Sequence, residues 1–321
     1  MFSASCKPGV YAGIDCGTGG IRMIIFQVEA DGSFKRLEGV SVDHKIGKDL
    51  NNTGAISPET ITHLSETTKQ FIQTAEDFGT TRIRAVATES IRSARNGPEV
   101  LAKLAGHGIP FELLTGIQEL ELSLLGARSF LKPLQEEYYF ADSGGDSTEI
   151  ALVDGTAGAI MAGKSLRVGV SSMAKQLMEL PDKPNKQEIE AFTDKLSKMF
   201  SRKIADWDKP RTKADKFVIA GSPLYLKRFQ LRHETKQRDS YLGALLTLED
   251  LIKIATELAE LGHEGRKQSP YLDSAGVYFM LPAAIKALAL LKATGTNKVM
   301  IAPSGICAGL ALQQAAEKGA A

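Results

Sequence analysis

The sequence is poor in cysteine and tryptophan and has almost no net charge. The lack of cysteine and the lack of net charge each exclude a class of protein. Of its 321 residues, 3 are Cys and 1 is Trp, and 39 Lys and Arg nearly balance 38 Asp and Glu. So few, widely separated cysteines match neither a zinc-binding spacing nor a disulfide framework. A net charge of +1 gives no overall field that attracts nucleic acid or a membrane surface. We therefore expect neither partner.

Long apolar runs are also missing from the sequence. Residues 1–7 are polar and carry no signal-peptide core, and no run reaches the roughly 18 apolar residues of a membrane helix. Hydrophobic residues make up 43% and charged residues 24% of the chain, which is the balance of a soluble globular protein. The length predicts about two domains, and we expect them in the reducing cytoplasm.

One short pattern is present in two copies. Residues 13–20 read GIDCGTGG, and residues 140–149 read FADSGGDSTE. Each copy lies between apolar runs, which predicts a strand, a glycine turn and a strand, with an aspartate near the tip. The glycines let backbone N–H groups approach an oxyanion, and the aspartate can hold a hydrated divalent cation. The pair predicts two related domains that grip one phosphate chain.

Other local signals predict the elements around these hairpins. Ser57 before Pro58 predicts a helix start, and Thr247 is expected to cap a second helix. Residues 45–50 are expected to form a polar loop, and the alanine-rich residues 278–294 a buried helix. This order of strands and helices predicts a mixed sheet surrounded by helices.

Five stretches follow the order and spacing of motifs in one known family. They are residues 15–22 for D-x-G-(S/T)-x-(S/G)-x-R, 46–57 for LGEGLDxTGxLS, 87–92 for A-T-x-x-x-R, 115–119 for S-G-x-E-E, and 142–149 for D-x-G-G-(G/A)-S-T-E. On these stretches the chain resembles the exopolyphosphatase and guanosine pentaphosphate phosphohydrolase (Ppx/GppA) family. The match is clearest over residues 10–153 and looser beyond them.

The resemblance implies an α/β fold with two RNase H-like domains and a cleft between them. This is the superfold of actin, sugar kinases and heat-shock chaperones. We expect the first domain over residues 1–125 and the second over residues 126–307. By analogy with the family, a last helix over residues 308–321 packs back on the first domain.

The resemblance also implies hydrolysis of a terminal phosphoryl group from inorganic polyphosphate or from guanosine pentaphosphate. Glu119 corresponds to the family's catalytic glutamate, which orients or deprotonates a water for in-line attack. Mg²⁺ or another divalent cation is the expected cofactor, held by Asp15, Asp142 and Glu149. The residues expected to bind phosphate are Gly17, Thr18, Gly19, Arg22, Arg92, Gly144, Gly145, Asp146 and Ser147.

Three positions depart from the family pattern. Gln118 replaces the first of two adjacent glutamates, Glu121 replaces an arginine, and Asp146 replaces a small residue. These changes favour one alternative, a non-catalytic phosphate or nucleotide sensor. A guanosine pentaphosphate 5′-phosphohydrolase that uses the same residues is a second, and a phosphotransferase is a third, since the superfold includes kinases. The metal, the preferred chain length and the oligomeric state, including a homodimer, also stay open.

Overall fold

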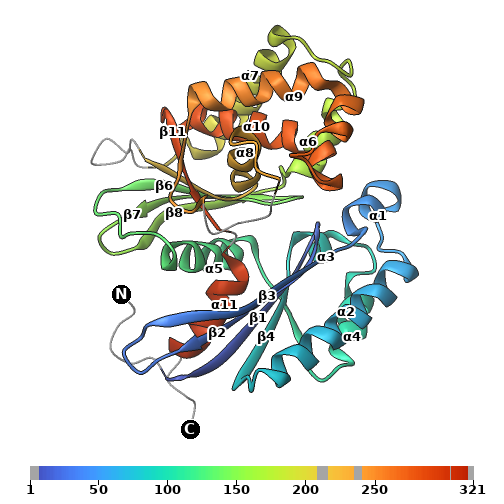
Figure 1. Ribbon diagram of the computed structural model, residues 1–321, viewed down its shortest axis with the longest axis vertical. Coiled ribbons are helices and arrows are strands. Elements are labelled where there is room, and N and C mark those ends of the chain that lie inside the picture. The colour runs from blue at the N-terminus through green and yellow to red at the C-terminus, as the bar shows by residue number, and fades with distance from the viewer. Residues whose placement is uncertain (1–6, 208–215, 235–240, 304, 317–321) are drawn as a thin grey trace. The chain divides into compact units, whose positions relative to one another are not determined.

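The computed structural model describes residues 7–207, 216–234, 241–303 and 305–316. The chain divides into two compact units, each built around one mixed sheet (Figure 1). Unit 1 comprises Met1–Ser129 and Ser304–Ala321, and unit 2 comprises Phe130–Pro303. The predicted α/β fold with two mixed sheets is confirmed.

Unit 1 contains a sheet in the order β3-β2-β1-β4-β5. Strands β1, β2 and β3 pair antiparallel, whereas β4 and β5 continue the sheet parallel to β1. The elements of this unit are β1 (Gly9–Gly17), β2 (Gly20–Val28), β3 (Phe34–Asp43), α1 (Ile46–Thr53), α2 (Pro58–Asp77), β4 (Arg82–Ala87), α3 (Glu89–Ser93), α4 (Gly97–Ala105), β5 (Phe111–Leu113), α5 (Gly116–Ser129) and α11 (Ile306–Ala316).

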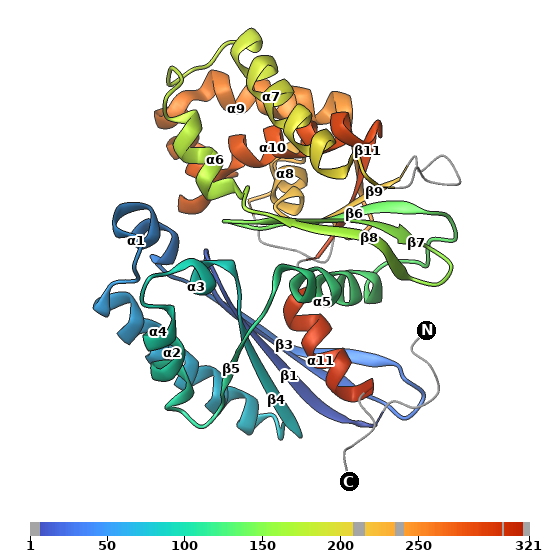
Figure 2. The ribbon, with the colours of Figure 1, turned by 180° about the vertical axis from the view of Figure 1, so that it is seen from behind.

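Different helices cover the two faces of this sheet because neighbouring side chains on a strand point to opposite sides. Ala85 on β4 belongs to a buried cluster with Leu64 of α2. The next residue, Val86, lies in a separate cluster with Leu122 of α5 and Leu310 of α11. Figure 2 shows α11 beside α5, so the end of the chain returns to unit 1. Residues 317–321 of the predicted last helix lie outside the described residues.

The prediction of a polar loop at residues 45–50 was wrong. These residues enter α1, whose Ile46 is fully buried in the core of unit 1 and whose Leu50 packs against it. Gly54 ends the helix in the left-handed conformation (φ 70°) and donates its N–H to the carbonyl of Leu50. Residues 45–50 are mostly polar, but Ile46 and Leu50 form an apolar pair at i, i+4. One such pair is enough to hold a short helix on a core.

Unit 2 contains a sheet in the order β10-β11-β9-β6-β7-β8. Its elements are β6 (Tyr138–Ser143), β7 (Thr148–Asp154), β8 (Ala159–Leu166), α6 (Val170–Leu177), α7 (Lys186–Ile204), β9 (Phe217–Gly221), α8 (Pro223–Gln230), β10 (Leu245–Thr247), α9 (Leu248–Gln268), α10 (Ser274–Thr294) and β11 (Lys298–Ala302). The predicted helix caps at Ser57 in unit 1 and Thr247 in unit 2 are confirmed, since each side chain accepts a first-turn N–H.

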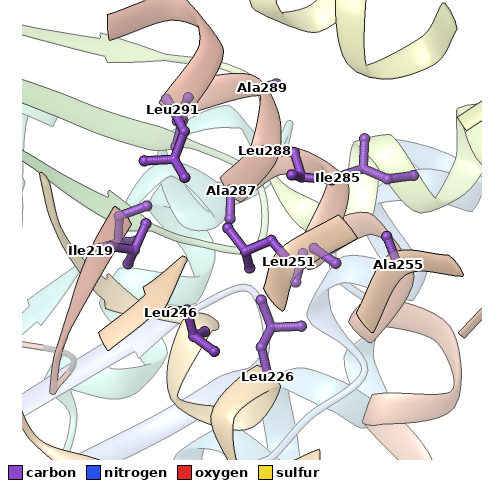
Figure 3. Packing of buried hydrophobic residues seen from close by; sticks show 14 of the residues in the cluster. Ile219, Leu226, Leu246, Leu251, Ala255, Ile285, Ala287, Leu288, Ala289 and Leu291 are labelled. Atoms are coloured by element: carbon purple, nitrogen blue, oxygen red, sulfur yellow. The ribbon is translucent and has the colours of Figure 1, made fainter. Parts of the chain in front are cut away.

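Helix α10 forms the centre of the unit 2 core. Figure 3 shows its Ile285 and Leu288 among Leu226 of α8, Leu246 of β10 and Leu251 of α9. The helix has 21 residues, and the mean hydropathy of its most apolar window is 1.6, which by length and composition is enough to cross a membrane. It contains the buried helix predicted over residues 278–294, and Lys286 and Lys292 interrupt its apolar run. The helix is nevertheless 72% buried in its most apolar window, as in the core of a folded domain.

Candidate functional site

The first hairpin places an acidic and a basic side chain opposite each other near its tip. Strands β1 and β2 pair as far as Gly17 and Gly20, and Asp15 lies opposite Arg22 in the register. Asp15 is only 5% exposed. Gly20 has φ of 147°, a conformation that side chains rarely adopt. The tight turn therefore depends on glycine at this position.

The turn between these strands is fixed by α1 and its preceding loop. The carbonyl of Thr18 accepts the N–H of Gly47, and the carbonyl of Gly19 accepts the N–H of His44, both at 3.3 Å. A Cβ added to Gly19 would lie 3.8 Å from Nη2 of Arg22, so this guanidinium lies beside the turn. Four of the residues predicted to bind phosphate are thus neighbours: Gly17, Thr18, Gly19 and Arg22.

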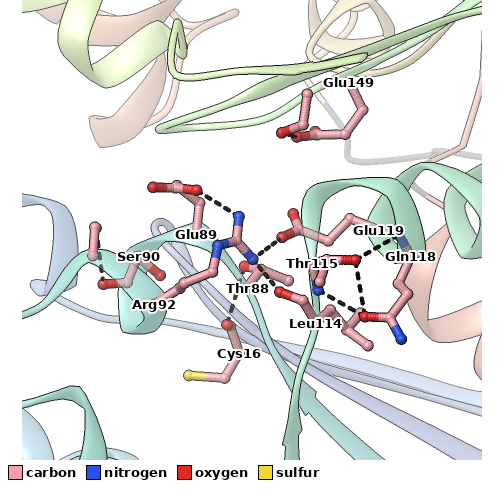
Figure 4. A network of polar contacts seen from close by, with 12 residues as sticks. Cys16, Thr88, Glu89, Ser90, Arg92, Leu114, Thr115, Gln118, Glu119 and Glu149 are labelled. Carbon is pink, nitrogen blue, oxygen red and sulfur yellow. Dashed lines mark hydrogen bonds and ion pairs between the residues drawn. The ribbon is translucent and has the colours of Figure 1, made fainter. Parts of the chain in front are cut away.

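Arg92 joins the predicted catalytic residue to a second buried carboxylate. Its Nη1 donates to Oε1 of Glu119 at 2.7 Å, and its Nη2 donates to Oε2 of Glu89 at 2.5 Å. Nη1 also donates to the carbonyl of Leu114. Figure 4 shows Arg92 between the two carboxylates. The acids are 3% and 6% exposed, so the guanidinium compensates part of the cost of burying them.

The electrostatics of Arg92 follow from this arrangement. Burial alone would lower its pKa, but the hydrogen bonds and charges of Glu119 and Glu89 outweigh burial and raise it. A guanidinium has five N–H donors, and Arg92 uses three of them on acceptors among the described residues. The remaining two can serve a phosphate oxygen.

On α5, Glu119 is buried, whereas Gln118 and Glu121, the two neighbouring residues that depart from the family pattern, are exposed. Oε1 of Gln118 accepts the N–H and the hydroxyl of Thr115 at 2.8 and 3.0 Å, so Gln118 caps the start of the helix. Glu121 is exposed, whereas Glu119 is buried. The reversed charge at Glu121 therefore lies on a different side of the helix from Glu119.

The second hairpin brings two carboxylates together. Asp142 on β6 lies directly opposite Glu149 on β7, and they are 7% and 3% exposed. Oε1 of Glu149 accepts the hydroxyl of Ser165 at 2.7 Å. Burial raises the pKa of Glu149 to about 7, with the charge of Asp142 acting in the same direction, while Ser165, Ser147 and Lys286 oppose the shift.

The loop of residues 144–147 is held by the start of α6. The carbonyl of Gly144 accepts the N–H of Val170 at 3.2 Å, and the carbonyl of Gly145 accepts the N–H of Ser171 at 2.8 Å. A Cβ on Gly169 would lie 1.8 Å from the carbonyl oxygen of Gly145, so only glycine fits there. Asp146 is half-buried and Ser147 is buried within the same loop. The orientation of the peptide dipoles in this loop is therefore set by unit 2 itself.

The donor set of the second hairpin fits a hard divalent cation. Two buried carboxylates facing each other supply the oxygen ligands that Mg²⁺ prefers, and a cation between them would relieve their repulsion. Among the described residues no group of three or more His, Cys, Asp or Glu side chains is gathered for a metal ion. Asp142 and Glu149 would therefore leave most coordination positions to water and substrate oxygens, as is usual for Mg²⁺.

Two residues of these networks were missed in the sequence. Glu89 lies three residues before Arg92 on α3, a spacing that lets the two side chains meet. Lys286, which is fully buried, stands alone among apolar residues of α10, and an isolated lysine in such a run is itself a signal. The roles proposed for the predicted site residues stay predictions.

Comparison with known proteins gives consistent relatives. The model of a family described as "Ppx/GppA phosphatase family" matches residues 24–317. "Exopolyphosphatase 2" of Mycobacterium tuberculosis (strain CDC 1551 / Oshkosh) is 30% identical over 187 residues, which are 56% of this chain and 57% of that protein. The match thus spans little more than half the length of this relative.

Solved structures share the fold. A Ppx/GppA family member of Aquifex aeolicus superposes with a TM-score of 0.82 at 23% identity, covering 96% of this chain and 98% of that one. An exopolyphosphatase from Cytophaga hutchinsonii ATCC 33406 gives 0.81 at 18% identity, covering 95% and 97%. At these identities the likeness shows the fold alone.

Proposed function

This chain belongs to the Ppx/GppA phosphatase family, and on that basis we propose that it hydrolyses the terminal phosphoanhydride bond of inorganic polyphosphate. Water adds to the terminal phosphorus, the bridging P–O bond breaks, and the products are phosphate and a chain shorter by one unit. The name of the Mycobacterium tuberculosis relative, an exopolyphosphatase, supports this choice of substrate.

The observation that carries the proposal is the buried Glu119 held by Arg92 at 2.7 Å. Phosphoryl transfer depends on positioning and on charge stabilisation. A carboxylate fixed by a guanidinium is suited to orient a water and accept its proton. The two uncommitted N–H donors of Arg92 would contact an oxygen of the transferring group.

The glycine turns would bind the substrate through backbone amides. The carbonyl groups of Thr18 and Gly19 in the first turn, and of Gly144 and Gly145 in the second loop, accept hydrogen bonds within their own units. These peptide dipoles are therefore fixed and available for anionic oxygens. Asp142 and Glu149 of unit 2 are proposed to hold Mg²⁺, and Asp15 of unit 1 stays a predicted ligand. When bound, the cation would neutralise charge on the phosphate oxygens.

The proposal is tested by phosphate release from polyphosphate of medium length with Mg²⁺. Glu119→Gln should lower kcat by about 10²–10⁴-fold, the contribution of a positioned general base. Glu121→Gln removes the same charge from the exposed side of α5 and is the matched control, with an expected change below about twofold. Unchanged activity in Glu119→Gln would remove this residue from the mechanism.

The same assay separates two of the remaining candidates. Release from guanosine pentaphosphate but not from polyphosphate would assign the guanosine pentaphosphate 5′-phosphohydrolase activity to the same residues. Absence of release from both, with phosphate-dependent protection of the folded protein, would support the sensor.

A further inference from the structure

Lys286 is a buried cation to which the proposed reaction assigns no role. It lies on α10, whose neighbouring residues Ile285 and Ala287 are core residues, and its side chain is 0% exposed. An ammonium group is strongly hydrated in water, so burying it is costly unless hydrogen bonds and opposite charges compensate. An apolar residue of similar length would pack in this helix without that cost.

The hydrogen bonds of Lys286 go to both ends of the 144–147 loop. Its Nζ donates to the carbonyl of Gly144 at 3.1 Å and to Oγ1 of Thr148 at 3.2 Å. Thr148 is fully buried, and its hydroxyl donates a hydrogen bond to the carbonyl of Val168. Lys286 therefore joins the strand ends that carry the loop, although it comes from a helix far away in the sequence.

The charges that face Lys286 are those of Asp142 and Glu149. Burial lowers the pKa of Lys286 to about 7, while the charges of Glu149 and Asp142 oppose this shift. Both carboxylates are buried beside the bonded loop. In a region of low dielectric such interactions are much stronger than in water. The described surroundings of Lys286 thus supply two carboxyl groups and two neutral acceptors.

We propose that Lys286 is a resident counter-charge of the Asp142–Glu149 pair. Its ammonium group holds the 144–147 loop in place and weakens the binding of a divalent cation to these carboxylates. Lysine and cation compete for the same negative charge. The proposal deepens the proposed function, because it rests on that function for the identity of the cation as Mg²⁺.

Direct metal titration tests this competition without substrate. Mn²⁺ is added to the wild type and to Lys286→Met, and free Mn²⁺ is followed by electron paramagnetic resonance. We expect Lys286→Met to bind at least about tenfold more tightly, since one buried positive charge has been removed. Lys292→Met is the matched control, because Lys292 lies on the same helix and pairs with Asp194 at the surface. Equal, weaker or absent binding in Lys286→Met overturns the proposal.

A double-mutant cycle tests the counter-charge in the absence of metal. Urea unfolding is measured with EDTA for the wild type, Lys286→Met, Glu149→Gln and the double variant. Lys286→Met should lower the urea midpoint in the wild type and lower it less in the Glu149→Gln background. Additive effects overturn the proposal. If Lys286→Met does not fold, Lys286→Gln, which keeps an N–H donor without the charge, replaces it in both experiments with the same expectations.

These experiments are independent of the activity assay. Phosphate release that persists in Glu119→Gln would refute the proposed mechanism, yet the cycle and the titration would still report on Lys286. Conversely, additive unfolding data would refute the role of Lys286 and leave the hydrolase proposal intact.

Discussion

At the scale of single residues, Arg92 forms ion pairs with two carboxylates in unit 1. It holds Glu119 at 2.7 Å and Glu89 at 2.5 Å, and both acids are almost inaccessible to water. A lysine cannot reproduce this arrangement, because its ammonium lacks the planar fork that reaches several acceptors at once. The stability of this region and the proposed chemistry therefore depend on the same side chain.

Arg92→Met is expected to lower the free energy of unfolding by roughly 3 kcal/mol, because it removes the guanidinium that pairs with two buried carboxylates. Urea unfolding at pH 7 measures the effect. The double variant Glu89→Gln/Arg92→Met should recover part of the loss, since one of the stranded charges is gone. A double variant no more stable than Arg92→Met would contradict this account.

His44 predicts a pH dependence of stability. Neither nitrogen of its ring has a hydrogen-bond partner among the described residues, and the ring lies 4.5 Å from that of His63. Burial, followed by the charge of His63, lowers the pKa of His44 from 6.5 to about 4, with Asp43 opposing. Between these two values the unfolded chain binds a proton that the native protein does not.

The contribution of His44 to the unfolding free energy should therefore fall as the pH drops from 6.5 towards 4, whereas the raised pKa of Glu149 acts in the opposite direction and is common to wild type and variant. His44→Gln should flatten that fall, as measured by urea unfolding at several pH values. Above pH 7.5 the difference between variant and wild type should not depend on pH. A wild-type slope retained in full by the variant would exclude His44 as its source.

At the scale of elements, the close approach of α5 and α11 requires glycine. A Cβ on Gly309 would lie 2.1 Å from the carbonyl oxygen of Leu122, and one on Gly126 would lie 2.0 Å from that of Gly305. Backbone atoms cannot yield as a flexible side chain can, so a methyl group must push the helices apart. The approach bears on the proposed mechanism because α5 also carries Glu119.

Gly309→Ala is expected to lower the free energy of unfolding by about 1–3 kcal/mol, the usual cost of overpacking, despite alanine's better helix propensity. Chemical denaturation measures it. Gly106→Ala, at the exposed end of α4, is the control, with an expected change within about 0.5 kcal/mol. Equal effects of the two substitutions would argue against a close helix contact.

At the scale of the whole molecule, the two units repeat one strand arrangement. The order β3-β2-β1-β4-β5 in unit 1 corresponds to β8-β7-β6-β9-β11 in unit 2, with β10 added at the edge. The hairpins that carry Asp15 and Asp142 occupy the same place in each sheet. This repetition explains why one sequence pattern appears twice.

If Mg²⁺ is the cofactor, EDTA should abolish phosphate release from the wild type, and added Mg²⁺ should restore it. Cations neutralise the charge that develops on transferring phosphoryl groups, and buried carboxylates alone would repel the substrate. The far-UV circular dichroism spectrum should be unchanged by EDTA, which separates loss of the cation from unfolding. Full activity in EDTA would refute the assignment of Mg²⁺.

The sequence by itself determined the family and the local structure of both hairpins. The Ppx/GppA resemblance is confirmed by the family match. It could be recognised in the sequence because the spacing of glycine, aspartate and apolar residues shapes a hairpin within a few residues. The same holds for the caps at Ser57 and Thr247, which depend on the next turn of chain alone. Local rules failed at residues 45–50, where burial of Ile46 decided in favour of a helix.

Only the tertiary structure decided which charged and polar groups from distant parts of the sequence meet. Glu119 reaches Arg92 across 27 positions of sequence, and Lys286 reaches Gly144 across 142. Such contacts depend on how helices pack on a sheet, which periodicity and motif spacing do not encode. Burial then makes each contact strong, because an ion pair that is weak in water gains energy where water is excluded.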